Sequence, residues 1–212
     1  MGREWEPHTP VRESWMLAIM PQPWASKYPE LFTPSSFAWG GMGDHRLEIE
    51  FTLEEPPDAL VANVKVIGRT STGIVVCGTD QGWRMLPGGT REPGETIAET
   101  ASRELLEEAG GVITGPLTSV GAFRVDASKT EPYRPHLPYP ISYWLYVAAD
   151  VELRARPTHP ADGENVTSVV TLPATDAIEY LAGFDDGPLT SILRLAVDMG
   201  HARLADPSTN GR

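Results

Sequence analysis

The sequence contains one cysteine, Cys77, among 212 residues, so no disulfide can form within the chain. It also lacks any apolar run approaching the roughly 18 residues that a membrane-spanning helix needs. The start, MGREWEPHTP, has neither the basic region nor the apolar core of a signal peptide. Together these absences favour a cytoplasmic protein in which Cys77, within GIVVCG, is a buried strand residue.

Positive charge is also scarce. The chain has 17 Lys and Arg against 29 Asp and Glu, a net charge of −12, and its basic residues do not gather into a block. Duplex DNA or RNA is therefore not an expected partner, because such binding relies on clustered Lys and Arg. Small phosphorylated ligands remain compatible with this charge, since a bound cation can supply positive charge locally.

The most informative stretch is Gly88 to Val112, GGTREPGETIAETASRELLEEAGGV. Thr96 and Glu99 have the spacing of a capping box, and Gly110 is placed to end a helix. Between them, apolar residues recur at every fourth position: Ile97, Ala101, Leu105 and Ala109. This spacing predicts a helix with one apolar side that packs against a sheet.

Three acids of this helix, Glu104, Glu107 and Glu108, fall at positions i, i+3 and i+4 and so share one face. Like charges at this spacing repel one another. A hard divalent cation such as Mg²⁺ or Mn²⁺ removes the repulsion, because it prefers carboxylate oxygen ligands. The alternative is an ordinary solvent-exposed acidic helix.

The stretch resembles the signature of the Nudix hydrolases, G-x5-E-x7-R-E-U-x-E-E-x-G-U, in which U is a bulky apolar residue. The fixed positions are occupied by Gly89, Glu95, Arg103, Glu104, Leu105, Glu107, Glu108 and Gly110. One position departs, because Gly111 stands where the final U belongs and Val112 follows it. A change at this packing position is expected to affect local stability more than chemistry.

The resemblance implies a metal-dependent hydrolase that cleaves a diphosphate linkage in a nucleoside diphosphate derivative or related nucleotide. It implies that Arg103 braces the glutamates through a salt bridge and that Glu95 fixes the turn before the helix. It also implies the ligands of the cation, Mg²⁺ or Mn²⁺: Glu104, Glu107, Glu108 and the backbone carbonyl of Gly88.

The general base is open, because family members use either a glutamate of the signature or an acid on a distant loop. Glu104 is the candidate within the signature, and Glu164, just before the segment NVTSVVTLP, is the distant one. Asp126 and Glu131 are weaker candidates.

Substrate-binding residues are expected in the irregular segment 126–140, DASKTEPYRPHLPYP, because long loops in compact domains are commonly functional. Tyr133, Arg134, His136 and Tyr139 are residue types that stack on bases or pair with phosphate oxygens. We expect Tyr133 and Arg134 of this segment to bind the substrate, together with Arg84 and Arg124. Substrate identity stays open, since the motifs typical of individual Nudix subfamilies are mostly absent.

The rest of the chain is rich in strands. We expect strands at 46–55, 60–69, 73–79, 83–89, 117–126, 141–153 and 165–173, with helices at 174–183 and 190–205 and a short one near 9–20. Segments 60–69 and 73–79 are expected to form a hairpin. The pattern predicts an α/β fold, a Nudix-type α/β/α sandwich with a mixed sheet. The predicted division is an N-terminal extension (1–57), a Nudix domain (58–185), and a C-terminal helix and tail (186–212).

The extension carries Trp5, Trp15, Trp24 and Trp39 and an alternating strand, RLEIEFTLEE, that would expose an edge if left unpaired. A homodimer that uses residues 1–57 would cover both, and an extension folded onto its own domain is the alternative. Two alternative functions also stay open. One is a catalytically silent Nudix-fold module that senses a nucleotide, and the other is an isomerase acting on an isoprenoid diphosphate through Cys77.

Overall fold

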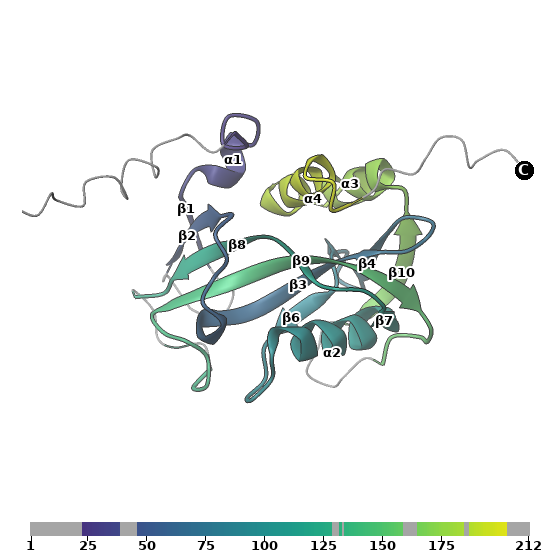
Figure 1. Cartoon of the computed structure of the whole chain (residues 1–212), viewed down its shortest axis with the longest axis horizontal. Coiled ribbons are helices and arrows are strands. Elements are labelled where there is room, and N and C mark those ends of the chain that lie inside the picture. Colours follow the sequence, from purple (N-terminus) through teal and green to yellow (C-terminus); the bar gives the residue numbers. More distant parts are fainter. Residues whose placement is uncertain are drawn as a thin grey trace, which may run out of the picture.

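The computed structural model describes residues 23–38, 46–128, 132, 134–158, 165–184 and 187–202. Over these residues the chain forms a ten-stranded sheet with helices on both faces (Figure 1). The strands are β1 (Ser35–Ala38), β2 (Arg46–Thr52), β3 (Val61–Arg69), β4 (Ile74–Thr79), β5 (Arg84–Met85), β6 (Gly88–Thr90), β7 (Gly111–Ile113), β8 (Thr118–Asp126), β9 (Ile141–Leu153) and β10 (Val166–Leu172).

The central path of the sheet runs β1-β2-β8-β9-β3-β4-β10, and β5, β6 and β7 pair with β4, β3 and β9. The pairing of β3 with β9 is parallel, whereas the pairs β8 with β9 and β10 with β4 are antiparallel. The sheet is therefore mixed, as the sequence predicts.

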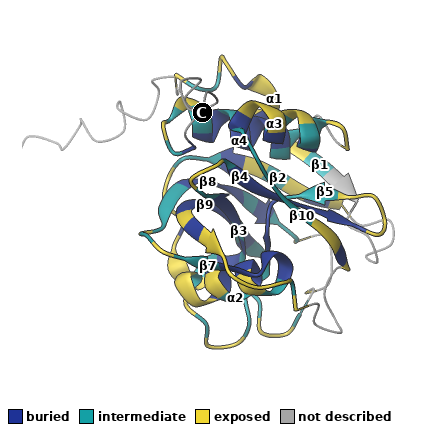
Figure 2. Cartoon of the chain, turned by 90° about the vertical axis from the view of Figure 1, so that its right-hand side faces the viewer, coloured by how far each residue is buried: buried dark blue, intermediate teal, exposed yellow. Residues whose placement is uncertain are grey.

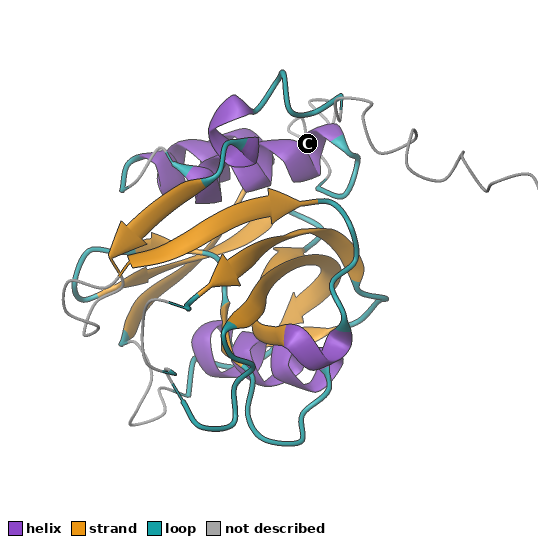
Figure 3. Ribbon diagram, turned by 90° about the vertical axis from the view of Figure 1, so that its left-hand side faces the viewer, coloured by secondary structure: helices purple, strands orange, loops and turns teal. Residues whose placement is uncertain are grey.

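The helices are α1 (Pro29–Phe32), α2 (Ile97–Ala109), α3 (Ala174–Ala182) and α4 (Pro188–Asp198), with a 3₁₀ turn, η2 (Asp58–Leu60). Helix α2 covers one face of the sheet, and α3 and α4 cover the other (Figures 1 and 3). The predicted α/β/α sandwich is confirmed.

The core has two apolar layers, one on each face of the sheet (Figure 2). Strand β9 supplies both, because successive side chains of a strand point to opposite faces. Tyr146 and Ala148 belong to the layer beneath α3 and α4, whereas Leu145 and Val147 face α2. The continuous apolar run in β9 follows from this two-sided burial.

Helix α2 begins and ends where its capping residues predict. The Thr96 hydroxyl accepts a hydrogen bond from the Glu99 amide at 3.2 Å, and the Glu99 carboxylate accepts one from the Thr96 amide at 2.8 Å. Gly110 adopts a left-handed conformation with φ 64° at the C-terminus. Ala101, Leu105 and Ala109 are buried against the sheet.

The predicted hairpin of β3 and β4 is present, closed by a hydrogen bond from the Thr70 amide to the Gly73 carbonyl at 2.8 Å. The single strand expected at 83–89 is instead two strands. Strand β5 pairs with β4, and β6 pairs with β3, so the chain changes partner at Leu86 and Pro87. A proline has no backbone N–H to continue a ladder, which explains the break.

The described residues before Pro57, 23–38 and 46–56, pack on the rest of the chain. Strand β2 is hydrogen-bonded to β1 on one side and to β8 on the other, so it is not an edge. Helix α1 lies against α4, where the Tyr28 hydroxyl donates to Asp198 and Ser191 donates to Glu30 at 2.5 Å. The argument for a dimer from an unpaired strand at 46–55 therefore does not apply, and the homodimer stays a prediction.

Several expectations for the extension lie outside the described residues, namely the helix near 9–20 and the side chains Trp5, Trp15 and Trp39. Trp24 packs at the margin of the core. The division at 57/58 and 185/186 also stays a prediction, although Ile192, Leu193 and Leu195 of α4 share one apolar core with α3 and with β2.

Candidate active site

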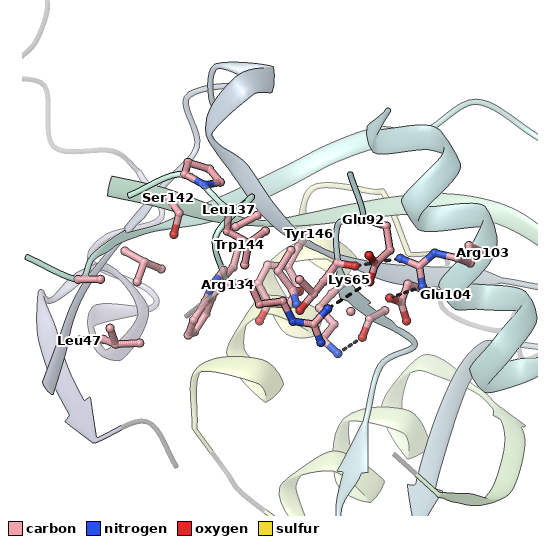
Figure 4. A pocket seen from close by; sticks show the side chains of 18 of the residues that line it. Leu47, Lys65, Glu92, Arg103, Glu104, Arg134, Leu137, Ser142, Trp144 and Tyr146 are labelled. Carbon is pink, nitrogen blue, oxygen red and sulfur yellow. Dashed lines mark hydrogen bonds and ion pairs between the residues drawn. The ribbon is translucent and has the colours of Figure 1, made fainter. Parts of the chain in front are cut away.

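A cavity of about 600 Å³ opens between α2, β3, β6, β9 and the segment 134–140 (Figure 4). This volume lies within the range of small-molecule sites. We call one part the acidic end, lined by Gly88, Gly89, Arg103, Glu104, Glu107 and Glu108. The opposite part is the aromatic end, lined by Leu47, Val125, Leu137, Pro138, Tyr139 and Trp144. Lys65, Arg134 and Tyr146 lie between the two (Figure 4).

Two glycines of β6 allow close approach of its neighbours, Gly88 toward β3 and Gly89 toward Glu104 of α2. Gly88 has φ 138°, a conformation that side chains disfavour, and a Cβ there would overlap the Val64 carbonyl of β3. A Cβ on Gly89 would lie 2.5 Å from the nearer carboxylate oxygen of Glu104. The space that Gly89 leaves is therefore filled by the carboxylate of Glu104.

Arg103 organises the acidic end. Its guanidinium donates to Glu95 Oε1 at 2.7 Å, to Glu104 Oε1 at 2.8 Å and to Glu107 Oε2 at 3.1 Å. It also donates to the Thr90 carbonyl at 2.9 Å, which ties α2 to β6. The expected salt bridge between Arg103 and the glutamates is thus present, and it fixes the direction in which two of them point.

Glu95 holds the turn that precedes α2. Besides Arg103, its carboxylate accepts hydrogen bonds from the Glu92 amide and the Thr100 hydroxyl, each at 2.9 Å. The hydrogen bond from Arg103, followed by these partners, lowers the pKa of Glu95 from 4.5 to about 2. Glu95 therefore remains charged throughout the neutral range.

Two carboxylates of the acidic end are nearly removed from solvent. Glu104 is 8% exposed and Glu108 is 6% exposed, whereas Glu107 is only partly buried. The Gly88 amide donates to Glu108 Oε2 at 2.8 Å. Burial raises the pKa of Glu104, and the charge of Arg103 opposes that rise. A buried carboxylate is costly unless a cation compensates it.

The aromatic end combines β2, β8 and β9 with the segment 134–140. Leu47 is 5% exposed and Tyr139 is 45% exposed, so this end runs from the core to the surface. Arg134 bonds to Glu92 at 3.1 Å, and the His136 ring lies 3.2 Å from the Arg91 carbonyl. These two contacts hold the segment over the turn that precedes α2. The resulting surface combines apolar area, aromatic rings and a guanidinium.

A family model described as the NUDIX domain matches residues 61–190, which is more than half of the chain. The chain belongs to the Nudix family. The matched range contains the Nudix signature and every described residue of the acidic end. The prediction of a Nudix hydrolase is confirmed.

Solved structures of similar proteins include a NUDIX hydrolase from Nitrosomonas europaea, 17% identical, covering 71% of this chain and 95% of that one, with a TM-score of 0.48. A Bacillus subtilis pyrophosphohydrolase is 21% identical over 58% of this chain and 70% of that one, with a TM-score of 0.44. An ADP-ribose pyrophosphatase from Streptococcus suis is 14% identical over 65% and 90%, with a TM-score of 0.41.

The substrate-binding candidates fall in different places. Arg134 lines the cavity. Arg84 instead stacks on Tyr180 of α3, 4.7 Å from the ring centroid, and Arg124 has its carboxylate partner Asp126 at 3.8 Å. Among the described residues that line the cavity, neither Arg84 nor Arg124 is present. Tyr133 lies outside the described residues.

Of the candidates for the general base, Glu104 is at the acidic end of the cavity. Asp126 is the last residue of β8 and does not line the cavity. Glu164 and Glu131 lie outside the described residues, so their roles stay predictions.

Nudix hydrolases generally use divalent metals. Among the residues that the structure describes, no three acidic, His or Cys side chains are spaced to hold a metal ion as they stand. The donor set nevertheless fits a hard cation, because three carboxylates and the Gly88 carbonyl line one end of the cavity. Arg103 and the Gly88 amide now engage the carboxylates that would serve as ligands.

The sequence did not indicate Lys65, Trp144 or Tyr146 as residues of the site. One sequence feature could have identified Lys65, since its charged side chain interrupts the apolar strand VANVKVIG. Trp144 and Tyr146 lie two apart in β9 and thus on one face, but the sequence of a strand buried on both sides does not tell which face borders a cavity. Burial raises the pKa of Tyr146, so its hydroxyl stays protonated.

The departure from the Nudix signature has a local explanation. A Cβ on Gly111 would lie 2.9 Å from Cγ of Leu105. The Leu105 side chain, which is fully buried, already fills the place where an apolar residue would pack. Gly111 begins β7 and pairs with Leu153, so the helix exit is joined to the sheet without a large side chain.

Cys77 is fully buried in β4, behind α2, where its thiol lies 3.6 Å from the Glu108 carbonyl. Burial raises the pKa of the thiol to about 12. A buried, protonated thiol cannot face a substrate, which argues against the isomerase alternative.

The helices among the described residues are also too short or too polar for any of them to cross a lipid bilayer.

Proposed function

We propose that the protein hydrolyses the phosphoanhydride linkage of a nucleoside diphosphate derivative or related nucleotide with the help of Mg²⁺ or Mn²⁺. One observation carries the proposal. Glu104, Glu107 and Glu108 line one end of a cavity whose other end is apolar and aromatic. A diphosphate joined to an organic group has the same division into an anionic and an apolar part.

The acidic end cannot hold a diphosphate by itself, because both would be anionic. Glu104, Glu107, Glu108 and the Gly88 carbonyl would hold the cation. When bound, the cation neutralises the phosphates and lowers the pKa of the attacking water. Arg103 keeps Glu104 and Glu107 aimed at the cavity through its bonds of 2.8 and 3.1 Å.

In the reaction, the oxygen of water forms a bond to phosphorus and the bond to the bridging oxygen breaks, while a carboxylate accepts the proton of the water. A nucleoside diphosphate derivative then gives two phosphate monoesters, and a nucleoside triphosphate gives a nucleoside monophosphate and pyrophosphate. At the aromatic end, Trp144 and Tyr139 offer rings on which a planar base can stack, and Arg134 offers a guanidinium to a phosphate.

Glu104 and Glu164 are the two main candidates for the general base, and a substitution of Glu164 distinguishes them. A positioned general base contributes on the order of 10²–10⁴ in rate. We expect Glu164→Gln to lower kcat to this extent while the dissociation constant of the substrate stays nearly unchanged. If kcat instead stays within about threefold of the wild-type value, the base is Glu104 or an acid of the segment 126–140.

The proposed reaction is tested by incubating the protein with nucleoside diphosphate sugars, ADP-ribose, dinucleoside polyphosphates and nucleoside triphosphates, each with Mg²⁺ and with Mn²⁺. For the substrates whose phosphates are capped at both ends, phosphate released from the products by an added phosphatase reports hydrolysis. For nucleoside triphosphates, which a phosphatase attacks directly, pyrophosphate release is measured with an added inorganic pyrophosphatase instead. We expect turnover of at least one class, and its loss with a chelator. Binding of a nucleotide without turnover would overturn hydrolysis and favour the silent sensing module.

A further inference from the structure

Lys65 is a basic residue in the middle of β3, between Val64 and Val66, both of which are fully buried. It lies opposite Gly88 in the pairing of β3 with β6. Its side chain is partly buried and lines the cavity, where Figure 4 shows it beside the carboxylates. A cation on a strand of this kind is costly unless nearby groups compensate its charge.

The compensation comes from the acidic end. The Lys65 ammonium donates to the Gly88 carbonyl. Its aliphatic chain runs along the same glycine, since a Cβ on Gly88 would lie 3.0 Å from Cδ of Lys65. Lys65 and Glu104 line the same cavity, and Figure 4 shows both side chains there.

The Gly88 carbonyl thus receives an ammonium group at the place where the proposed function assigns it to a divalent cation. A carbonyl oxygen can accept from an ammonium or coordinate a divalent cation, and two positive charges close to one oxygen repel each other strongly. The hydrogen bond from Lys65 to the Gly88 carbonyl and the coordination of a divalent cation by the same oxygen therefore weaken each other.

We propose that Lys65 is a built-in counter-ion of the acidic end, which holds the Gly88 carbonyl in the cation-free protein and competes with the divalent cation for it. This inference rests on the cation site of the proposed function, but not on the substrate or on the reaction.

The alternative is that Lys65 only extends its charged group to solvent along an apolar surface, as lysines commonly do. In that case its charge would matter little to the cation. The proposal predicts tighter cation binding when the charge of Lys65 is removed, whereas the alternative predicts no change, and the two can be separated without any measurement of hydrolysis.

The test is calorimetric titration of Mn²⁺ into the cation-free full chain, with Lys65→Met compared with wild type. Methionine keeps much of the length of the side chain and removes the charge. We expect Mn²⁺ to bind Lys65→Met more tightly, with a dissociation constant lower on the order of tenfold. In chelator, Lys65→Met should melt at a lower temperature than wild type, and saturating Mn²⁺ should close most of this gap.

Two controls distinguish the effect of the positive charge at position 65 from the effect of removing a positive charge elsewhere in the protein. Lys65→Arg keeps the charge and should bind Mn²⁺ with a dissociation constant close to that of wild type. Lys27→Met removes the same charge from an exposed position, where Lys27 pairs with Asp198 and neither residue lines the cavity, and should leave Mn²⁺ affinity unchanged. If Lys65→Met does not fold, Lys65→Gln replaces it with the same expected tightening.

An equal or weaker affinity for Mn²⁺ in the neutral variants would overturn the role of Lys65. Absence of any Mn²⁺ binding by wild type would instead overturn the cation site on which the proposed function depends. The two failures are therefore distinguishable in the same titration.

Discussion

The two ends of the cavity are built in different ways. The acidic end comes from one continuous segment, in which β6 and α2 follow each other between Gly88 and Glu108. The aromatic end is assembled from β2, β8, β9 and the segment 134–140, so that Leu47 and Trp144 meet only in the folded chain. The residues proposed to hold the cation are thus encoded locally, whereas the aromatic end depends on tertiary structure.

Removal of the residues before Pro57 would break the aromatic end most severely. Four side chains of this segment are at most 5% exposed: Tyr28, Leu31, Leu47 and Phe51. Burial of each such side chain contributes about 1.5–3 kcal/mol, and a whole domain is stable by only about 5–15 kcal/mol. We expect a chain that starts at Pro57 to show no cooperative thermal transition by circular dichroism.

The full-length chain is the reference for this truncation. A truncated protein with the same melting temperature and turnover as the full-length chain would show that β1 and β2 are dispensable, and that the aromatic end does not need Leu47.

Glu107→Gln and Glu108→Gln test the acidic end without changing its shape. Each removes one charge from the proposed cation site, and loss of one preorganised electrostatic contributor costs on the order of 10²–10³ in rate. We expect kcat to fall to this extent at limiting Mg²⁺, with the fold intact by circular dichroism. Glu152→Gln is the matched control, because Glu152 is exposed and bonds to Arg154 away from the cavity. Wild-type turnover in both cavity variants would refute the assignment of the acidic end.

The acidic end could be predicted from sequence because its information is local. A helical repeat places Glu104 and Glu108 on one side of α2, and the capping residues Thr96 and Gly110 define where the helix begins and ends. Arg103 is adjacent to Glu104 in sequence and bonds to it directly. None of these contacts requires knowledge of which strands pair.

The aromatic end could not be predicted because it depends on strand order and register. Arg84 and Arg124 each lie on a strand whose pairing turns the side chain to a partner outside the cavity. Lys65 and Trp144 face the cavity because β3 pairs in parallel with β9, a long-range pairing that the sequence pattern does not specify. Arg134 does line the cavity, and the irregular composition of its segment is a local signal; its role in substrate binding stays a prediction.

Trp144→Leu sharpens the comparison by changing the aromatic end alone. Loss of a stacking ring removes on the order of 1–3 kcal/mol of binding to a base, and leucine keeps the site apolar. We expect KM for the best substrate to rise about tenfold, with kcat changed by less than about threefold, because this contact contributes equally to substrate and transition state. Tyr143→Leu is the control, since Tyr143 is the preceding residue of β9 and packs on the face toward α2.

A fall in kcat without a change in KM would place Trp144 among the groups that act on the reacting phosphate. It would thereby remove the distinction between the two ends.

The smallest expected effect concerns Glu95, which supports the acidic end without lining the cavity. Its pKa is about 2 in the folded protein, below its ordinary value of 4.5, chiefly because of the hydrogen bond from Arg103. The unfolded chain therefore binds the proton more readily, so the stabilisation is complete above pH 4.5 and is lost as the pH falls toward 2. We expect Glu95→Gln to melt about 2–4 °C below wild type at pH 7, the shift for roughly 1 kcal/mol in a chain of this size.

This difference in melting temperature between Glu95→Gln and wild type should shrink as thermal scans are made at successively lower pH below 4.5. A gap that stayed constant down to pH 3 would show that the carboxylate of Glu95 stabilises the turn without its charge, and that Arg103 owes its position to Glu104, Glu107 and the Thr90 carbonyl instead.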